Sequence, residues 1–330
     1  MNVAPARHRG RASNGVVRLA TSWDVDRLPS ARGKVFVVTG GNAGIGYFVS
    51  EQLARAGARV LIAGRSAERG ERTERAIRAV LPDADLGHLR LDLADLGSVA
   101  KAGAEIAALE RVDGLVMNAG VLTQFERQET ADGNELVFGT DHLGHAALGA
   151  HAYPGLARTP GSRVVMVGSF GARLVRLRLG DLQASQGRYH GFSTYLRAKL
   201  AQMVYAYELD RRLRAAGSGV SSVQAHPGGA LDGLTPPRPP VQVRTAKLRA
   251  IGLAGLLTGA QSKEAAAWPI VRAALDPAAE GGQLYGPRYL RTRGRPVLEK
   301  PAAHFLDARS GERLWKATEE LTGVAWPIDR

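Results

Sequence analysis

The chain has 330 residues, a formal net charge of +13 and no cysteine, and 45% of its residues are apolar. This length suits one large α/β domain or two small ones, and the lack of cysteine excludes a disulfide framework, a thiolate metal site and a cysteine nucleophile. The positive charges are mostly arginine and are scattered, and no basic block alternates with aromatic residues, so we expect no nucleic-acid partner.

The N-terminal stretch, residues 1–20, is polar and basic, and we expect a disordered arm there. A single domain is expected over residues 21–330. No apolar run is long enough to span a bilayer, and no apolar signal-peptide core follows the basic residues. These features predict a soluble, cytoplasmic protein without a transmembrane segment.

A glycine-rich turn stands near the start of the expected domain. Residues 35–38 form a short apolar run typical of a strand buried on both faces, and Gly40, Gly44 and Gly46 separate it from a helical pattern. The free N–H groups at such a helix start can hold a pyrophosphate. However, Val49 occupies the last glycine position of the strict G-x-G-x-x-G fingerprint. The pattern alone therefore leaves dinucleotide binding and an ordinary turn equally open.

Short apolar runs and helical patterns then alternate along the chain. Strands are expected at residues 59–63, 88–93, 113–117, 163–167, 220–225 and 283–285, and helices at residues 68–81, 97–109, 134–156, 193–216, 263–275 and 311–321. Ser98 is the expected cap of the helix at 97–109. The alternation predicts an α/β fold with a Rossmann-type, doubly wound parallel sheet.

In such a fold, ligands bind beyond the carboxyl ends of the strands. The residues that follow the expected strands are Thr39 to Gly46, Arg65, Asp92, Asn118 to Gly120, Ser169 and Pro227. We expect them to share one rim. Residues 231–260 contain four prolines and a short apolar helix pattern at 246–257, for which a substrate lid and a plain surface excursion are equally open.

Tyr195 and Lys199 are four residues apart in the helix at 193–216, so both lie on one face. An ammonium next to a tyrosine favours the phenolate and lets the pair exchange a proton near neutral pH. For an isolated pair, a surface tyrosine beside a solvated lysine is the better interpretation. Here the pair follows a strand that ends at Ser169, in a chain with a nucleotide-type turn.

Taken in order, these motifs resemble the short-chain dehydrogenase/reductase family. They are Thr39-Gly40-x-x-x-Gly44-x-Gly46, Asp92-Leu93, Asn118-Ala119-Gly120, Ser169, Tyr195-x-x-x-Lys199 and Pro227-Gly228. The phrases Asp141-His142-Leu143-Gly144-His145 and Lys199-Leu200-Ala201 are similar to the retinol-dehydrogenase-like and protochlorophyllide-reductase-like branch. The resemblance covers about residues 29–285.

The resemblance implies a role for each matched residue. The cofactor would be bound by Gly40, Asn42, Gly44, Ile45, Gly46, Arg65, Asp92, Leu93, Asn118, Ala119, Gly120, Tyr195, Lys199, Pro227 and Gly228. Tyr195 would act as the general acid/base, Ser169 would orient the substrate oxygen, and Lys199 would hold the nicotinamide ribose and favour the phenolate of Tyr195. The hydride chemistry belongs to the cofactor.

Arg65 follows the second strand, where an acidic residue would bind the ribose hydroxyls of NAD. An arginine instead offers paired donors to the 2′-phosphate of NADP. We therefore predict NADP (NADPH) as the cofactor.

Two residues depart from the family pattern. Asp141 stands where the family usually has an asparagine that holds a water in a proton relay, and Asp232 stands where a threonine usually meets the nicotinamide amide. We expect Asp141 still to serve the relay. His142 and His145 lie three apart on a helix, but no third ligand accompanies them, so we predict no metal site.

The resulting hypothesis is an NADP-dependent oxidoreductase that interconverts a carbonyl and a secondary alcohol. The apolar segment around residues 246–257 suggests an apolar or aromatic small molecule as substrate. The alternatives are a low-turnover NADP-binding sensor or scaffold of the same fold, and a non-redox member that catalyses dehydration or epimerisation. A homo-oligomer is compatible with the sequence.

Overall fold

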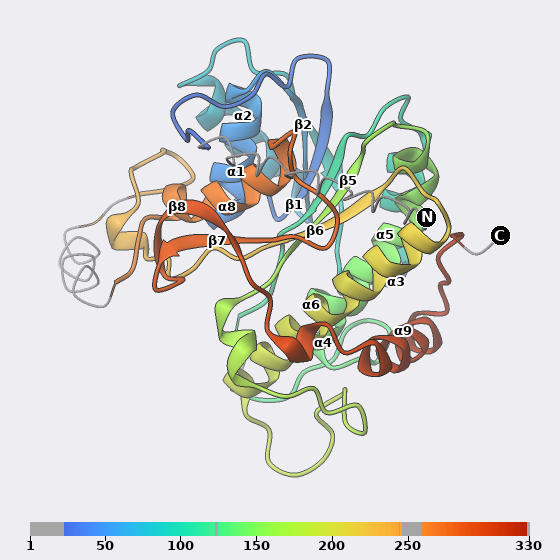
Figure 1. The fold of residues 1–330 in the computed structure, drawn as a ribbon. Helices are drawn as coiled ribbons and strands as arrows, with labels where there is room; N and C mark the ends of the chain where they lie inside the picture. The colour runs from blue at the N-terminus through green and yellow to red at the C-terminus, as the bar shows by residue number, and fades with distance from the viewer. Residues whose placement is uncertain (1–22, 123–124, 244, 246–258, 329–330) are drawn as a thin grey trace, which may run out of the picture.

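The computed structural model describes residues 23–122, 125–243, 245 and 259–328. These residues build one eight-stranded sheet in the order β3-β2-β1-β4-β5-β6-β7-β8 (Figure 1). The strands are β1 (Val35–Thr39), β2 (Arg59–Gly64), β3 (Leu86–Arg90), β4 (Gly114–Met117), β5 (Arg163–Val167), β6 (Ser221–Ala225), β7 (Leu284–Tyr289) and β8 (Arg293–Glu299). Strands β1 to β7 pair in parallel, and β8 pairs antiparallel with β7. The predicted Rossmann-type fold is confirmed.

Helices cover both faces of the sheet (Figure 1). They are α1 (Gly44–Arg55), α2 (Ala67–Arg78), α3 (Leu96–Ala108), α4 (Leu136–Phe138), α5 (Gly144–Ala157), α6 (Gly191–Ala215), α8 (Lys263–Leu275) and α9 (Ala308–Thr322), with short turns η1 (Gly139–Leu143), η2 (Phe170–Leu174), η3 (Asp232–Leu234) and η4 (Ala303–Phe305). The apolar residues of α3, α5, α6 and α9 form the core on one face, and those of α1, α2 and α8 form the core on the other.

The central strands explain why both faces need a cover. Along β4, Leu115 and Met117 point into the first core, and Val116 points into the second. All three side chains are fully buried, as expected for parallel strands between two helical layers. The cores fix the strands, and the strand ends then fix the positions of the residues that follow them.

The long helix expected at residues 134–156 differs from the structure in two respects, and the second concerns the site. It begins later, at Leu136, because the Glu135 carboxylate accepts hydrogen bonds from the amides of Val137 (3.0 Å) and Phe138 (2.7 Å). It is then interrupted by the π-helical segment η1, which contains Asp141. Single π-helical turns inside helices are frequent at functional sites.

Two further expectations need correction near the third strand. The strand expected at residues 88–93 lies at Leu86–Arg90, because its register with β2 ends where Gly64 pairs with Arg90. The expected cap Ser98 is not the cap of α3. Instead, the Asp95 carboxylate accepts from the Ser98 amide (3.1 Å), while Ser98 Oγ accepts from the Asp92 amide (3.0 Å).

The C-terminal edge of the sheet is larger than expected. The strand expected at residues 283–285 extends to Tyr289, and β8 follows it. The sequence of β8 carries no apolar run, because an edge strand is half exposed and has charged residues such as Arg293 on its outer side. The other helices begin and end within four residues of their expected bounds, and residues 263–275 match α8.

Three expectations fall on residues outside the described ones. The first is the disordered arm at residues 1–20, and the second is the helix at residues 246–257. The third is the lid at residues 231–260, because that helix makes up much of it. The described part of that segment contains η3 and the turn that leads to residue 243. The lid therefore stays a prediction.

Candidate active site

The glycine turn joins β1 to α1 as the sequence predicts. Gly40 (φ +64°) and Gly44 (φ +56°) adopt the left-handed conformation that favours glycine. Gly46 lies against the Gly40 carbonyl and the Asn118 side chain so closely that a Cβ atom would collide with both. The helix start at Ala43 has no side-chain cap, and no acidic residue lies in the first turn. Its free N–H groups and positive end are therefore available to a phosphate.

Thr39, at the end of β1, connects this turn to β4. Its Oγ accepts hydrogen bonds from the amides of Asn118 (2.9 Å) and Ala119 (3.0 Å), and Asn118 Nδ2 donates to the Thr39 carbonyl (3.0 Å). Strands β1 and β4 are the neighbours at which the strand order reverses, which is where ligands bind in such sheets. The predicted residues Asn118 and Ala119 thus lie beside the glycine turn.

His145 extends this network, a role that no sequence pattern predicts. Because Thr39 Oγ already accepts two hydrogen bonds, its own proton can be donated to His145 Nε2 (2.9 Å). His145 Nδ1–H then donates to the Asp141 carbonyl (2.8 Å). Burial lowers the pKa of His145 to about 3, so the ring is neutral near pH ~7. Its neighbour His142 contacts Thr318 Oγ instead (2.9 Å), so the two rings have different partners.

Asp141 and Lys199 form a buried ion pair. Lys199 Nζ lies 3.2 Å from Asp141 Oδ2, and their side chains are 6% and 0% exposed. Burial raises the pKa of Asp141, against the opposing effects of the Lys199 ammonium and of the Val121 amide, which donates to Oδ1 (2.7 Å). Lys199 also donates to Gln202 Oε1 (2.8 Å). Gln202 was not predicted, although its position three residues after Lys199 on the same helix is a signal for it.

Tyr195 lies half-buried on α6, with Lys199 Nζ 5.9 Å from the centre of its ring. Ser169 follows β5, and its Oγ accepts a hydrogen bond from the Gly171 amide (3.3 Å). Gly171 in turn packs against Leu196, where a Cβ atom would lie 2.8 Å from the Leu196 side chain. The turn that carries Ser169 is therefore packed on α6 next to Tyr195.

The remaining predicted residues lie along the same rim. Arg65 is exposed after β2, and Asn42 contacts Gly64 at the end of that strand. Asp92 Oδ1 accepts from the Ala94 amide (3.0 Å) after β3. Five other predicted positions have described surroundings. Leu93 is buried, and Ile45 is half-buried in the first turn of α1. Gly120 packs against Asp141 and Lys199, the Pro227 carbonyl accepts a hydrogen bond from Gln261, and Gly228 has a φ of +69°.

Asp232 binds Lys263, the first residue of α8. The two charged groups are 2.6 Å apart, and Gln242 Nε2 donates to the same carboxylate oxygen (3.0 Å). Partial burial opposes ionisation, but these two hydrogen bonds lower the pKa of Asp232 overall. Lys263 Nζ also reaches the glycine turn, since it lies 3.9 Å from the position of a Cβ atom on Gly44. Sequence reasoning missed this cation beside the phosphate-type turn.

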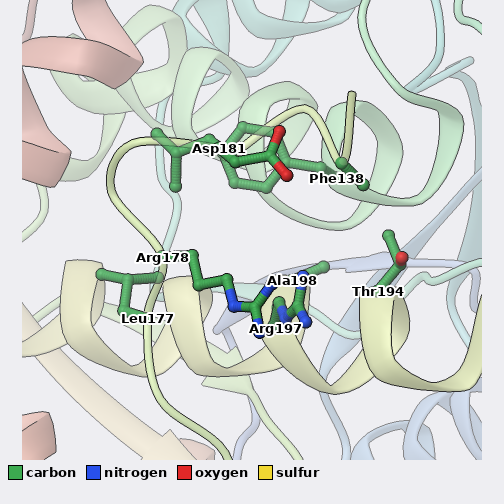
Figure 2. A pocket seen from close by; sticks show the side chains of 9 residues that line it. Phe138, Leu177, Arg178, Asp181, Thr194, Arg197 and Ala198 are labelled. Atoms are coloured by element: carbon green, nitrogen blue, oxygen red, sulfur yellow. The ribbon is translucent and has the colours of Figure 1, made fainter. Parts of the chain in front are cut away.

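A small cavity lies on the other side of α6 (Figure 2). In Figure 2, Phe138 and Asp181 lie across it from Arg197 and Ala198. Its volume is about 10 Å³, room for about one water molecule. This cavity is too small for an organic substrate and is not the reaction site.

The comparison with known families agrees with this geometry. The short chain dehydrogenase family model matches residues 34–208, which include the glycine turn and the Tyr195–Lys199 pair.

The chain belongs to the short-chain dehydrogenase/reductase family.

Named relatives place this oxidoreductase in the retinol-dehydrogenase-like branch. It is 36% identical to mouse polyprenol dehydrogenase over 302 residues, which are 90% of this chain and 86% of the relative. It is 33% identical to mouse retinol dehydrogenase 12 over 296 residues, 89% of this chain and 88% of the relative. The resemblance expected from the motifs is therefore confirmed.

Solved structures show the same fold. A protein from Mycobacterium paratuberculosis shares 31% identity and a TM-score of 0.75, over 93% of this chain and all of that chain. A protein from Beutenbergia cavernae, solved with NADP bound at low occupancy, shares 27% identity and a TM-score of 0.53 over 76% of this chain and 92% of that chain. None of the helices in the described part of the present chain has the length and apolar character needed to cross a bilayer.

Proposed function

We propose that this member of the family is an NADP-dependent oxidoreductase that interconverts a carbonyl and an alcohol on an apolar substrate. The observation that carries the proposal is the arrangement of Tyr195 and Lys199 on the same rim as the uncapped glycine turn. The turn fits a dinucleotide, because it combines left-handed glycines with a helix start free of negative charge. When bound there, NADPH supplies the hydride.

Tyr195 donates the proton to the carbonyl oxygen during reduction and removes it from the alcohol during oxidation. Ser169 hydrogen-bonds the same oxygen and orients it. Lys199 holds the nicotinamide ribose, with its ammonium 5.9 Å from the centre of the Tyr195 ring. Asp141 and Gln202, which both contact Lys199 Nζ, keep the ammonium in position, and Asp141 replaces the usual asparagine in the proton relay.

The proposed preference for NADP rests on charge. Arg65 is exposed at the end of β2, so its guanidinium can meet a 2′-phosphate with paired donors. Lys263 lies over the glycine turn and would act on the pyrophosphate of either cofactor. The two cations thus have different roles. Arg65 distinguishes NADP from NAD, and Lys263 strengthens the binding of both cofactors.

The apolar character of the substrate is supported by the relatives. Polyprenol and retinol, which give two of them their names, are apolar alcohols. A second function, NADP binding with little turnover, is favoured by one observation: Asp141 holds Lys199 in a buried ion pair that the usual asparagine would not form. Dehydration or epimerisation with bound cofactor is the third alternative.

A panel of apolar ketones and aldehydes tests the proposal. The purified chain is incubated with each carbonyl and with NADPH or NADH, and the loss of the reduced-nicotinamide absorbance is followed. The account predicts oxidation of NADPH with at least one carbonyl and a lower KM for NADPH than for NADH. Tight NADPH binding without oxidation by any carbonyl would favour the low-turnover alternative, and a preference for NADH would contradict the role of Arg65.

A further inference from the structure

The carboxylate of Glu299, the last residue of β8, joins three segments of the chain. His226 Nε2, directly after β6, donates to Oε1 (3.1 Å). Arg173 in η2 and Arg291 in the turn between β7 and β8 both donate to Oε2, at 3.3 and 3.0 Å. The side chains of Glu299 and His226 are 6% and 2% exposed. One buried carboxylate thus connects the segments that follow three neighbouring strands, β5, β6 and β7 (Figure 1).

Strand β7 leaves room for this carboxylate at Gly286. A Cβ atom at this position would collide with Glu299 Oε1 and with His226 Nε2, so a glycine is needed for the contact to form. Burial opposes ionisation of Glu299, but the hydrogen bond with His226 and the positive groups around it lower the pKa of its carboxyl overall. An ionised carboxylate only accepts hydrogen bonds, and it can therefore hold all three donors at once.

Two of the connected segments carry residues of the proposed site. The segment η2 begins directly after Ser169, and its first residue, Phe170, has its ring 6.4 Å from the ring of His226. His226 itself directly precedes Pro227 and Gly228, the turn expected to border the nicotinamide. The carboxylate therefore connects the turn beside the expected substrate oxygen to the turn beside the expected nicotinamide.

The third segment, the turn between β7 and β8, packs directly on the Pro227–Gly228 turn. The Thr292 carbonyl accepts a hydrogen bond from the Gly229 amide (2.9 Å), and a Cβ atom on Gly228 would collide with this carbonyl. Arg291 has a left-handed φ of +60°, a conformation that a non-glycine residue keeps only where its surroundings hold it. Its bond to Glu299 therefore helps to hold the turn against the two glycines.

We propose that Glu299 is a positioning residue, whose carboxylate holds the Pro227–Gly228 turn in the position that receives the nicotinamide. This inference rests on the proposed function, since it requires a nicotinamide cofactor at this rim. The physical reason is charge. Arg173 and Arg291 are always protonated and share one carboxylate oxygen, so they would repel each other without it. The two segments that carry them, and the turn packed between them, would then move apart.

Calorimetric binding measurements on the full-length chain test this role without turnover. The ligands are NADPH and 2′-phospho-ADP-ribose, which lacks the nicotinamide. Glu299→Gln keeps the size of the side chain and removes its charge. It is expected to lower the affinity for NADPH about five- to tenfold, as for the loss of one nicotinamide hydrogen bond, and to leave that for 2′-phospho-ADP-ribose unchanged.

Arg291→Gln is a second variant, chosen because its side chain is 52% exposed and the protein should fold without it. It is expected to show the same selective loss. NADH and ADP-ribose serve as a second pair of ligands, so a preference for NAD leaves the test intact.

Glu208→Gln is the matched control. The Glu208 side chain is also buried (1% exposed) and paired with two arginines, Arg211 and Arg212, but it lies more than two helical turns after Lys199 on α6. This variant is expected to unfold at a lower urea concentration than the wild type and to keep both affinities.

The proposal is overturned if Glu299→Gln keeps its affinity for the reduced cofactor, if it loses both affinities equally, or if Glu208→Gln shows the same selective loss. NADPH binding without oxidation by any carbonyl would refute the redox proposal and leave these outcomes unchanged. A wild-type chain that binds no dinucleotide would overturn the proposed function and this inference together.

Discussion

The buried pair between Asp141 and Lys199 allows a quantitative test of how the site is held together. Asp141→Ala removes the partner of a lysine whose side chain is 6% exposed, and it also leaves the Val121 amide without its acceptor. Removing one partner of a buried ion pair costs about 3–5 kcal/mol, because the remaining charge stays buried and unpaired. Such a cost is a large part of the ~5–15 kcal/mol by which domains are usually stable.

Glu312→Ala provides the matched control. The Lys316–Glu312 pair has the same separation as the Lys199–Asp141 pair, 3.2 Å, but its side chains are 65% and 53% exposed. An exposed pair contributes at most about 1 kcal/mol. Urea unfolding followed by circular dichroism gives both free energies. If Asp141→Ala destabilises the protein no more than Glu312→Ala does, the site is not held by this pair and the reasoning is refuted.

Three further changes follow from the cofactor site and the buried histidine. Arg65→Ala is expected to raise the KM for NADPH about tenfold and to leave the KM for NADH unchanged. The control Arg75→Ala, at the far end of α2, should alter neither KM. If Arg65→Ala raised both KM values equally, Arg65 would not contact the 2′-phosphate. Lys263→Ala is expected to raise both KM values together, and an effect on NADPH alone would contradict its place at the pyrophosphate. Burial lowers the pKa of His142 to about 3 in the folded protein. The wild type therefore loses folding free energy as the pH falls below about 6.5, the pKa of histidine in the unfolded chain. The His142→Phe variant lacks this titration, so its free energy of unfolding should fall by about 2 kcal/mol less than that of the wild type between pH ~7 and pH ~5. Equal losses in the urea unfolding of both proteins would contradict the neutral buried state.

The parts of the fold set by local pattern were predictable. A few neighbouring residues are enough to predict the central strands, from their apolar runs, and the turn at Gly40 and Gly44. The shared helix face of Tyr195 and Lys199 is predictable in the same local way, since side chains four residues apart lie on one face of a helix. The rule that ligands bind at the carboxyl ends of parallel strands then brought these pieces to one rim.

The contacts between distant segments were not predictable. Lys263 reaches the glycine turn from a helix more than 200 residues later, and His145 joins Thr39 only because α5 packs against the neighbouring strand β4. The π-helical break at Asp141 leaves no mark in the apolar periodicity. Strand β8 was missed because its half-exposed edge position needs no apolar run. In each case the feature depends on tertiary packing between distant segments, whereas a sequence pattern reports only local structure.

The most direct test of the central claim is the turnover of Tyr195→Phe with NADPH and the best carbonyl of the panel. Loss of the phenol removes the proton donor, and general acid catalysis contributes about 100- to 10,000-fold, so kcat is predicted to fall by that factor while NADPH affinity is retained. Tyr153→Phe is the matched control, because its hydroxyl bonds Ser218 (3.1 Å) on the side of α5 away from the glycine turn; it should turn over like the wild type. A Tyr195→Phe protein with wild-type turnover would contradict the account.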